Sequence, residues 1–204
     1  IIETRTGKVL EEHLLSKEAA KKAIAIGRKY DTLLEVYFDG QGYAQKDEIA
    51  QVRKYHKNPN MWDYFLRTRI AVDSLEDLLD EKEGNLDKVQ MLFADMEERE
   101  EAWKELEQEG VFELVGSLQY NIEINAVGVN KGTGLVNLGK MLGIRREEIM
   151  ACGDGDNDIA MLKEVGFGVA MANAEEKVKA VADYITESNN DEGVAKAIEK
   201  FVLK

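Results

Sequence analysis

Cysteine, proline and long hydrophobic runs are almost absent from this sequence, and basic residues are too few to balance the acidic ones. The single cysteine, Cys152, excludes a disulfide framework, which makes a reducing cytoplasm the expected location. No apolar run approaches the ~20 residues that a membrane-spanning helix needs, and no signal-peptide pattern is present. We therefore expect no membrane partner.

The charge balance excludes a further class of function. Lysine and arginine number 27 against 40 aspartate and glutamate residues, which gives a net charge of −13. Because nucleic-acid binding relies on a basic surface that neutralises phosphates, we expect no nucleic-acid partner. The same net charge repels an anionic substrate unless a local lysine or a bound cation reverses the field.

The first residues resemble the middle of a structural unit rather than its beginning. The sequence opens on Ile1 with no initiator methionine, and Thr6-Gly7 is typical of a turn between two short β-prone runs. We expect residues 1–15 to be a hairpin remnant of a core domain. We also expect the 204 residues to be part of a longer protein.

Residues 16–126 combine helical patterns with alternating strands. Ser16 is a suitable N-cap for a first helix, and Asp95 is one for a charged helix over 97–109. Hydrophobic periodicity predicts a short polar helix over 46–55 and strands over 33–38, 89–93 and 120–125. The alternation in the last strand is typical of an antiparallel sheet with one solvated face. We expect an α+β domain here.

The pattern changes over residues 127–204, where short apolar runs alternate with helices. A helix over 132–142, with Leu135, Leu138 and Leu142 inward, precedes the runs 149–152, 167–170 and 184–186, and Asp191 caps the final helix. Strands and helices that alternate through short connections predict a parallel sheet with helices on both faces. Only three such strands are present, so we expect an incomplete sheet whose first strands are missing.

The densest chemical signal is the run Gly153-Asp154-Gly155-Asp156-Asn157-Asp158, directly after the apolar run 149–152. Open α/β sheets place their ligands at the carboxyl ends of the strands. Three carboxylates this close repel one another, which suggests a cation between them. Oxygen ligands without nearby histidine or cysteine favour Mg²⁺ over zinc. The run therefore predicts a metal or phosphate site around Asp154.

Three plainer interpretations compete with this prediction. Asp156 or Asn157 is a good N-cap, and we expect one of them to cap the next helix. An EF-hand loop fits poorly, because its sixth position would be Ile159 and its twelfth Val165. A solvated acidic turn explains the carboxylates but not the glycines, which allow a close approach of the backbone to a ligand.

Lys131 begins the helix that precedes this run, in Gly128-Val129-Asn130-Lys131-Gly132. Its plainer interpretation is an exposed surface lysine. The dipole of a helix disfavours a lysine at its N-terminus. Beside an acidic cluster, however, the ammonium can neutralise a phosphate that arrives at the metal.

Four motifs in order give the segment from Val129 to Leu203 a close resemblance to the C-terminal half of haloacid-dehalogenase-like phosphatases of the Cof type. They are Val129-Asn130-Lys131-Gly132, the run from Gly153 to Leu162, the run from Gly168 to Ala174, and Ala182-Asp183-Tyr184-Ile185-Thr186 followed by Asn189 or Asn190 and then Gly193-Val194. The resemblance implies an α/β fold with a Rossmann-like core, of which residues 127–204 would be the C-terminal half. Residues 16–126 resemble the α+β cap domain that this subfamily inserts into its core.

The resemblance also implies a Mg²⁺-dependent phosphatase for a small phosphorylated metabolite such as a sugar phosphate. Lys131 would hold the substrate phosphate, and Asn157 would bond to it. Asp154 would bind Mg²⁺ directly, and Asp158 would support the metal's water or Lys131. We therefore predict Lys131, Asp154 and Asp158 as catalytic residues and the two aspartates as the metal site. Charge compensation of this kind is most of what phosphoryl transfer requires of a protein.

One motif of the family is absent from the sequence. The family's nucleophile, which forms an aspartyl-phosphate, is the first aspartate of a D-x-D-G-T motif, and Asp39-Gly40 has the wrong neighbours to be its remnant. We expect this motif in a missing N-terminal segment of the same protein, and we expect this chain alone to be inactive. The alternative is a non-catalytic or regulatory protein of the same fold that binds phosphate and Mg²⁺.

The resemblance assigns substrate selection to the cap domain, which makes residues 39–45 and 62–69 candidate substrate contacts. Trp62, Tyr64 and Phe65 are expected to belong to the core of that domain. Arg67 and Arg69 could bind an anionic leaving group, although a solvated strand face is the plainer interpretation. His13 and His56 are expected to have no catalytic role.

Overall fold

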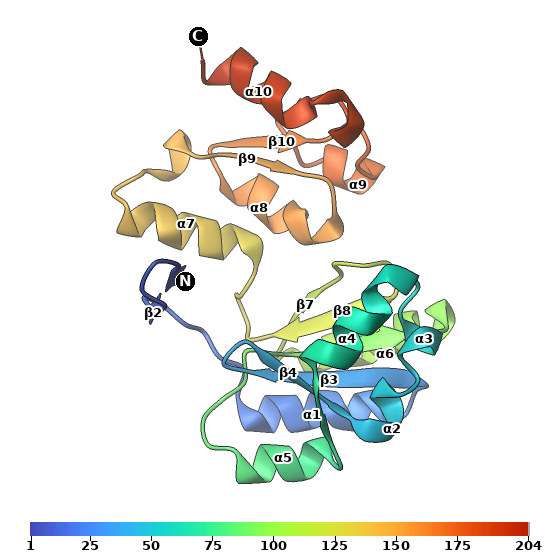
Figure 1. Cartoon of the computed structure of the whole chain (residues 1–204). Coiled ribbons are helices and arrows are strands. Elements are labelled where there is room, and N and C mark those ends of the chain that lie inside the picture. Colours follow the sequence, from blue (N-terminus) through green and yellow to red (C-terminus); the bar gives the residue numbers. More distant parts are fainter. Residues whose placement is uncertain (204) are drawn as a thin grey trace. The chain divides into compact units, whose positions relative to one another are not determined.

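The computed structural model describes residues 1–203, which divide into two compact units (Figure 1). One unit, here called the terminal unit, consists of Ile1–Glu11 and the chain from Gly128 onward. The other, here called the inserted unit, is Glu12–Val127. The inserted unit is thus a continuous stretch between two parts of the terminal unit. No helix within residues 1–203 is both long enough and apolar enough to cross a membrane.

A six-stranded sheet forms the centre of the inserted unit, in the order β5-β4-β3-β6-β8-β7. Its neighbours are antiparallel except for β4 and β5, which are parallel. The strands are β3 (Thr32–Phe38), β4 (Gln41–Gln45), β5 (Ile70–Val72), β6 (Lys88–Phe93), β7 (Glu113–Val115) and β8 (Asn121–Asn125). The three strands predicted from alternation are therefore confirmed as β3, β6 and β8.

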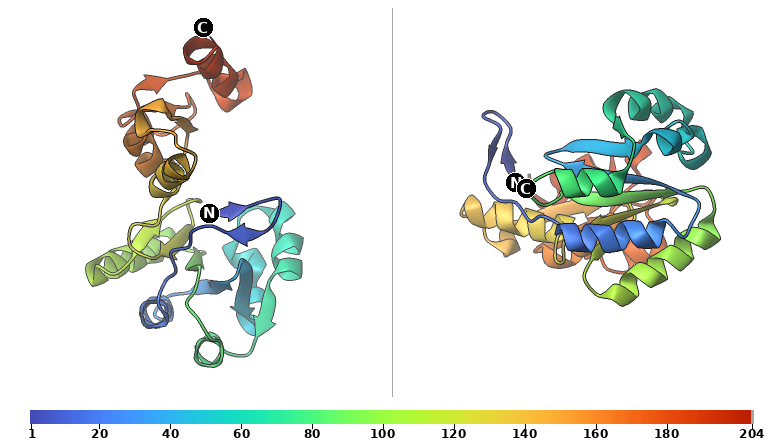
Figure 2. Two further views of the ribbon diagram at one scale, coloured as in Figure 1. Left: turned by 90° about the vertical axis from the view of Figure 1, so that its left-hand side faces the viewer. Right: turned by 90° about the horizontal axis from the view of Figure 1, so that it is seen from below.

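Three helices cover one face of this sheet: α1 (Lys17–Gly27), α5 (Leu75–Glu81) and α6 (Met96–Glu109). Helix α1 contacts both α5 and α6 and lies between them (Figure 2). The main apolar core lies between these helices and the sheet. Ser16 caps α1 by accepting a hydrogen bond from the Ala19 amide at 3.1 Å, and Asp95 caps α6, as predicted.

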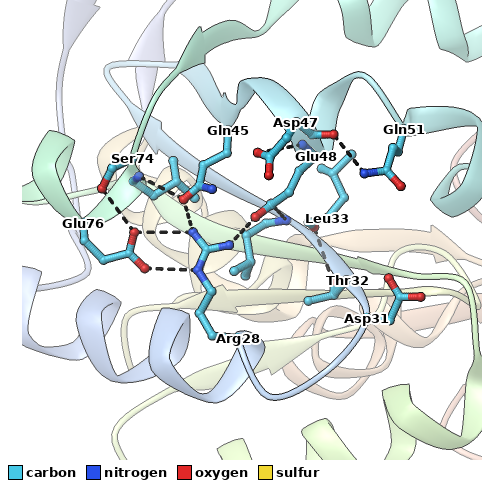
Figure 3. A network of polar contacts seen from close by, with 12 residues as sticks. Arg28, Asp31, Thr32, Leu33, Gln45, Asp47, Glu48, Gln51, Ser74 and Glu76 are labelled. Carbon is cyan, nitrogen blue, oxygen red and sulfur yellow. Dashed lines mark hydrogen bonds and ion pairs between the residues drawn. The ribbon is translucent and has the colours of Figure 1, made fainter.

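The opposite face is partly covered by short helices around a second apolar cluster. They are α2 (Lys46–Ile49), α3 (Val52–Tyr55), the 3₁₀ turn η1 (Pro59–Met61) and α4 (Trp62–Thr68). The prediction of one helix over 46–55 is wrong, because the backbone leaves the helical region at Gln51 (φ −99°, ψ 16°). Figure 3 shows how Arg28, just after α1, holds α2 and α5 by ion pairs with Glu48 and Glu76.

Arg69 follows α4 and points into the protein rather than into solvent. Its guanidinium donates to Glu35 Oε1 at 2.6 Å and to the Tyr37 hydroxyl at 2.7 Å. The side chains of Arg69 and Glu35 are only 8% and 0% exposed. The expectation that Arg69 lies on a solvated strand face is therefore wrong. Its side chain is buried because the buried Glu35 carboxylate on β3 requires a cationic partner.

The terminal unit contains a hairpin and a separate three-stranded parallel sheet in the order β11-β10-β9. The hairpin pairs β1 (Ile2–Glu3) with β2 (Lys8–Val9), and the parallel strands are β9 (Met150–Gly153), β10 (Phe167–Ala170) and β11 (Tyr184–Ile185). The predicted parallel sheet is confirmed. Asn137 donates to the Glu11 carboxylate at 2.7 Å and so joins the first residues to this unit.

Helices lie on both faces of the parallel sheet, with α7 and α8 on one side and α10 on the other (Figure 1). The helices and turns are α7 (Lys131–Met141), η2 (Arg146–Glu148), η3 (Asp156–Asp158), α8 (Ile159–Glu164), α9 (Glu176–Lys179), η4 (Asn189–Asp191) and α10 (Gly193–Phe201). Asp191 does not cap the final helix, contrary to prediction. Its carboxylate accepts the Ser188 hydroxyl within η4, and Glu192 occupies the N-cap position instead.

Strand β9 forms one edge of the parallel sheet, since within residues 1–203 it pairs with β10 alone. An apolar pocket of about 240 Å³ lies beside it, lined mainly by Leu135, Leu138, Leu142, Ile144, Ile149 and Met150. The prediction that Leu138 and Leu142 face inward is wrong, because they are 36% and 65% exposed. Helix α7 instead buries Gly132 and Gly139, and Gly132 packs against the backbone of Ala160 in α8.

Candidate active site at the carboxyl end of β9

Lys131 is the first residue of α7, and its neighbours fix it there. The Asn130 side chain accepts hydrogen bonds from the amides of Gly132 at 2.9 Å and Thr133 at 3.0 Å, which caps the helix. The cation therefore stands at the unfavourable end of the helix dipole. Lys131 Nζ lies 2.6 Å from Asp158 Oδ1, and this ion pair offsets that cost. The predicted association of Lys131 with the acidic run is confirmed.

The Asp158 carboxylate holds the loop that follows β9. Its Oδ1 accepts a hydrogen bond from Lys131 Nζ, and its Oδ2 accepts hydrogen bonds from the backbone amides of Asp154 at 2.9 Å and Gly155 at 3.0 Å. Burial by itself would raise the pKa of Asp158. The hydrogen bonds from Lys131 and the two amides outweigh burial, so its pKa is below the ordinary value. Asp158 is thus an ionised, 8%-exposed anchor for both Lys131 and Asp154.

The helix cap expected from Asp156 or Asn157 is not formed. These residues lie within the 3₁₀ turn η3, and neither η3 nor α8 has an N-cap hydrogen bond from their side chains. The Asp158 carboxylate, which bonds back to the loop, takes the place of the cap. Gly153 makes this possible, because a Cβ at that position would lie 2.5 Å from Asp158 Cβ.

Two of the three aspartates of the run Asp154–Asp158 form ion pairs with lysines, which reduces the repulsion among them. Asp158 is paired with Lys131, and Asp156 Oδ2 lies 2.5 Å from Lys177 Nζ of α9. Two of the three carboxylates are therefore neutralised by lysines, and repulsion alone does not require a cation. Asp154 is the acid of the run that has no cationic partner within residues 1–203.

Asp154 is exposed at the carboxyl end of β9, with one oxygen engaged. Asn173 Nδ2 donates to Asp154 Oδ2 at 2.9 Å, and Asn173 Oδ1 accepts the Asn189 amide at 2.9 Å. Sequence reasoning assigned no role to Asn173 or Lys177. The signal for Asn173 was its place just after β10, since parallel strands bring their carboxyl ends to one edge of the sheet.

The donor set suits a hard cation that keeps much of its water. Mg²⁺ is commonly held by one or two carboxylates together with waters and substrate phosphate. The exposed Asp154 carboxylate fits that pattern, although residues 1–203 contain no group of three aspartate, glutamate, histidine or cysteine side chains that could enclose a metal. Both oxygens of Asp158 are engaged by N–H donors, which favours its predicted support of Lys131 over direct metal binding.

Asn157, the predicted phosphate contact, lies on the same loop. Its Oδ1 is close enough to Gly155 that a Cβ there would lie 2.8 Å away. The loop thus brings Asn157 together with Lys131, Asp154 and Asp158 around one strand end, as expected from the sequence. Its contact with a phosphate stays a prediction.

The remaining candidate residues lie in the inserted unit, except for Cys152 of β9. Phe65 is buried, and the Trp62 indole donates to the His56 carbonyl at 2.8 Å within the second apolar cluster of the inserted unit. The expected place of Tyr64 in the core is wrong, because its side chain lies at the surface of α4 and the residue is 46% exposed. Burial lowers the pKa of His56 and raises that of the half-buried Cys152 thiol. Substrate contacts from residues 39–45 and 62–69 stay predictions.

Two relatives of this chain are named phosphatases. It is 50% identical over 105 residues to the 5-amino-6-(5-phospho-D-ribitylamino)uracil phosphatase of Bacillus subtilis, covering 52% of this chain and 42% of that protein. It is 41% identical over 81 residues to a phosphoglycolate phosphatase of Methanosarcina acetivorans, covering 40% and 36%. The chain thus spans less than half the length of these curated relatives.

Solved structures are similar over almost the whole chain. A haloacid dehalogenase-like hydrolase from B. subtilis superposes with a TM-score of 0.79 at 26% identity, covering 96% of this chain and 74% of that one. Another, from Bacteroides thetaiotaomicron, gives a TM-score of 0.73 at 26% identity, covering 98% and 72%. The sequence model of the haloacid dehalogenase-like hydrolases matches residues 1–198. With its α/β fold and its lysine–aspartate site, the chain belongs to the haloacid dehalogenase-like hydrolase family.

Proposed function

We propose that this chain forms part of a Mg²⁺-dependent phosphatase that hydrolyses a small phosphorylated metabolite, such as a sugar phosphate. The observation that carries the proposal is the 2.6 Å contact of Lys131 with Asp158 beside the exposed Asp154 carboxylate. The names of the two phosphatase relatives support the same reaction class. The single cysteine supports a cytoplasmic location, which is part of the proposal.

Each residue has a defined task in this proposal. Lys131 binds the phosphoryl oxygens, and Asp158 holds the ammonium in place at the strand end. Asn157 donates a hydrogen bond to the same phosphoryl group. Asp154 and Asp158 are the proposed metal residues, with Asp154 as the direct ligand. Mg²⁺, when bound, would supply charge neutralisation for the transferred group.

The nucleophile is proposed to come from a polypeptide outside this sequence, which contains no D-x-D-G-T motif. The proposed partner is an N-terminal segment of the same protein that pairs with the outer edge of β9. A strand placed there would bring its own carboxyl end next to Asp154 and would cover the apolar pocket beside β9. The solved relatives are longer than this chain, since 26% and 28% of their chains lie outside the part that it covers.

A phosphatase assay on two proteins tests the proposal. The product of the complete reading frame should hydrolyse p-nitrophenyl phosphate with Mg²⁺ and lose the activity in EDTA, whereas the 204-residue chain should not turn it over. Lys131→Met in the longer protein should reduce kcat/KM by about 10²–10³-fold, the usual cost of removing one transition-state donor. Lys140→Met, an exposed lysine of the same helix, is the matched control.

A second candidate is favoured by the missing motif alone: a non-catalytic protein that binds phosphate and Mg²⁺ and has a regulatory role. It predicts no turnover by the complete product while the chain still binds Mg²⁺. Equal activity of the two proteins would instead refute the proposed external nucleophile.

A further inference from the structure

The segment after β10 contacts the loop after β9 at the edge of the sheet where the candidate site lies. The Met171 amide donates to the Gly153 carbonyl at 3.0 Å, which continues the strand pairing by one residue. Two residues later, Asn173 Nδ2 donates to Asp154 Oδ2 at 2.9 Å. A side chain from one strand end therefore fixes the carboxylate at the end of its neighbour.

The same Asn173 side chain also contacts the loop after β11. Its Oδ1 accepts the Asn189 amide at 2.9 Å. A side-chain amide has donors on one side and an acceptor on the other, and this pair of contacts uses both. The reverse orientation would turn two oxygens toward each other at Asp154, so the network allows one orientation of the amide.

Asn173 differs in charge from the groups that hold the other two acids of the run. Asp156 and Asp158 are each paired with a lysine ammonium, which neutralises them. The amide of Asn173 orients Asp154 without adding positive charge. No lysine or arginine within residues 1–203 forms an ion pair with Asp154, and its Oδ1 accepts no hydrogen bond from these residues.

We infer that Asn173 is a positioning residue that orients Asp154 for a divalent cation, so that Oδ1 is the oxygen presented to the metal. This rests on the proposed function, in which Asp154 is the metal ligand. A hydrogen bond that fixes a ligand carboxylate typically changes metal affinity by about 10- to 100-fold when it is removed. Asn173 therefore sets metal affinity without touching the metal.

Binding of Mn²⁺ alone to the 204-residue chain tests this role without any activity assay. Mn²⁺ is paramagnetic and broadens nearby amide signals in a ¹⁵N–¹H spectrum, so titration of the Gly153 and Gly155 signals gives a Kd. We expect Asn173→Ala and Asn173→Leu to raise that Kd by about 10- to 100-fold. Asn190→Ala, the same change at an exposed asparagine whose side chain makes no hydrogen bond within residues 1–203, should leave it within twofold.

The outcomes separate this inference from the proposed function. If the wild-type chain binds Mn²⁺, Asp154→Asn abolishes binding, and both Asn173 variants bind as tightly as wild type, the inference is refuted and the metal assignment stands. If the wild-type chain shows no broadening at Gly153 and Gly155, the metal assignment of Asp154 fails, and the inference fails with it. If the affinity falls only together with shifts throughout β9, β10 and β11, Asn173 is structural rather than positioning.

Discussion

Removal of the Arg69 guanidinium should destabilise the inserted unit far more than removal of an exposed arginine. In Arg69→Ala, the fully buried Glu35 carboxylate keeps the Tyr37 hydroxyl at 3.0 Å but loses its ion pair. An uncompensated buried charge costs about 3–5 kcal/mol, whereas an exposed pair contributes about 0–1 kcal/mol. Since domains are stable by only about 5–15 kcal/mol, the loss should be a large fraction of the total.

The stability of Arg69→Ala should also change with pH in a defined direction. Burial raises the pKa of Glu35 above its ordinary 4.5, and Arg69 opposes that rise. Without Arg69, the Glu35 carboxylate binds a proton more readily in the folded protein than in the unfolded chain at pH values between 4.5 and its raised pKa. The stability of Arg69→Ala should therefore increase as the pH falls through that window, and its deficit against wild type should shrink.

Tryptophan fluorescence during urea unfolding is the appropriate assay, because Trp62 and Trp103 both belong to the inserted unit and the described terminal unit has no tryptophan. Arg67→Ala, an exposed arginine two residues away, is the matched control. The double variant Glu35→Leu with Arg69→Met removes both charges and places an apolar side chain where the Arg69 guanidinium lies over the Phe65 ring, and it should recover most of the stability. An Arg69→Ala deficit no larger than that of Arg67→Ala would refute the reasoning.

Three further predictions follow from the same structure. Lys131→Met should raise the pKa of Asp158, measurable by ¹³C NMR of the carboxyl group, because the ammonium is one of the groups that hold that pKa below its ordinary value. Burial lowers the pKa of His56 below 6.5, so folding stability should fall as the pH drops below 6.5. His56→Gln should flatten this part of the fluorescence-detected profile, and an unchanged profile would contradict the assignment. Gly153→Ala should cost about 1–3 kcal/mol by calorimetry, because its Cβ would overlap Asp158, whereas the same change at Gly134, where nothing lies within 4 Å, should not disturb packing.

The parallel sheet and the lysine–aspartate pair were predictable because each depends on local pattern. Short apolar runs between helices place β9, β10 and β11, and residues that directly follow parallel strands must gather at one edge. Lys131 was recognisable from its place at a helix start, where a cation needs an acidic neighbour.

The features that sequence reasoning missed depend on contacts between distant residues. Asn173 and Lys177 reach Asp154 and Asp156 across 19 and 21 residues, and nothing in either segment alone fixes that distance. Strand β4 has little apolar alternation, and it forms because the turn at Asp39 and Gly40, both with positive φ, folds it back onto β3. The burial of Arg69 likewise could be predicted only from the knowledge that Glu35 lies in the interior of the inserted unit.

The edge of β9 also determines how copies of this chain behave in solution. An unpaired strand edge beside exposed leucines is a template for self-association. At neutral pH the net charge of −13 keeps copies apart, but this repulsion vanishes near the isoelectric point of about 4.7. Moderate acidity should therefore increase self-association through this edge, and a pH above 7 should oppose it.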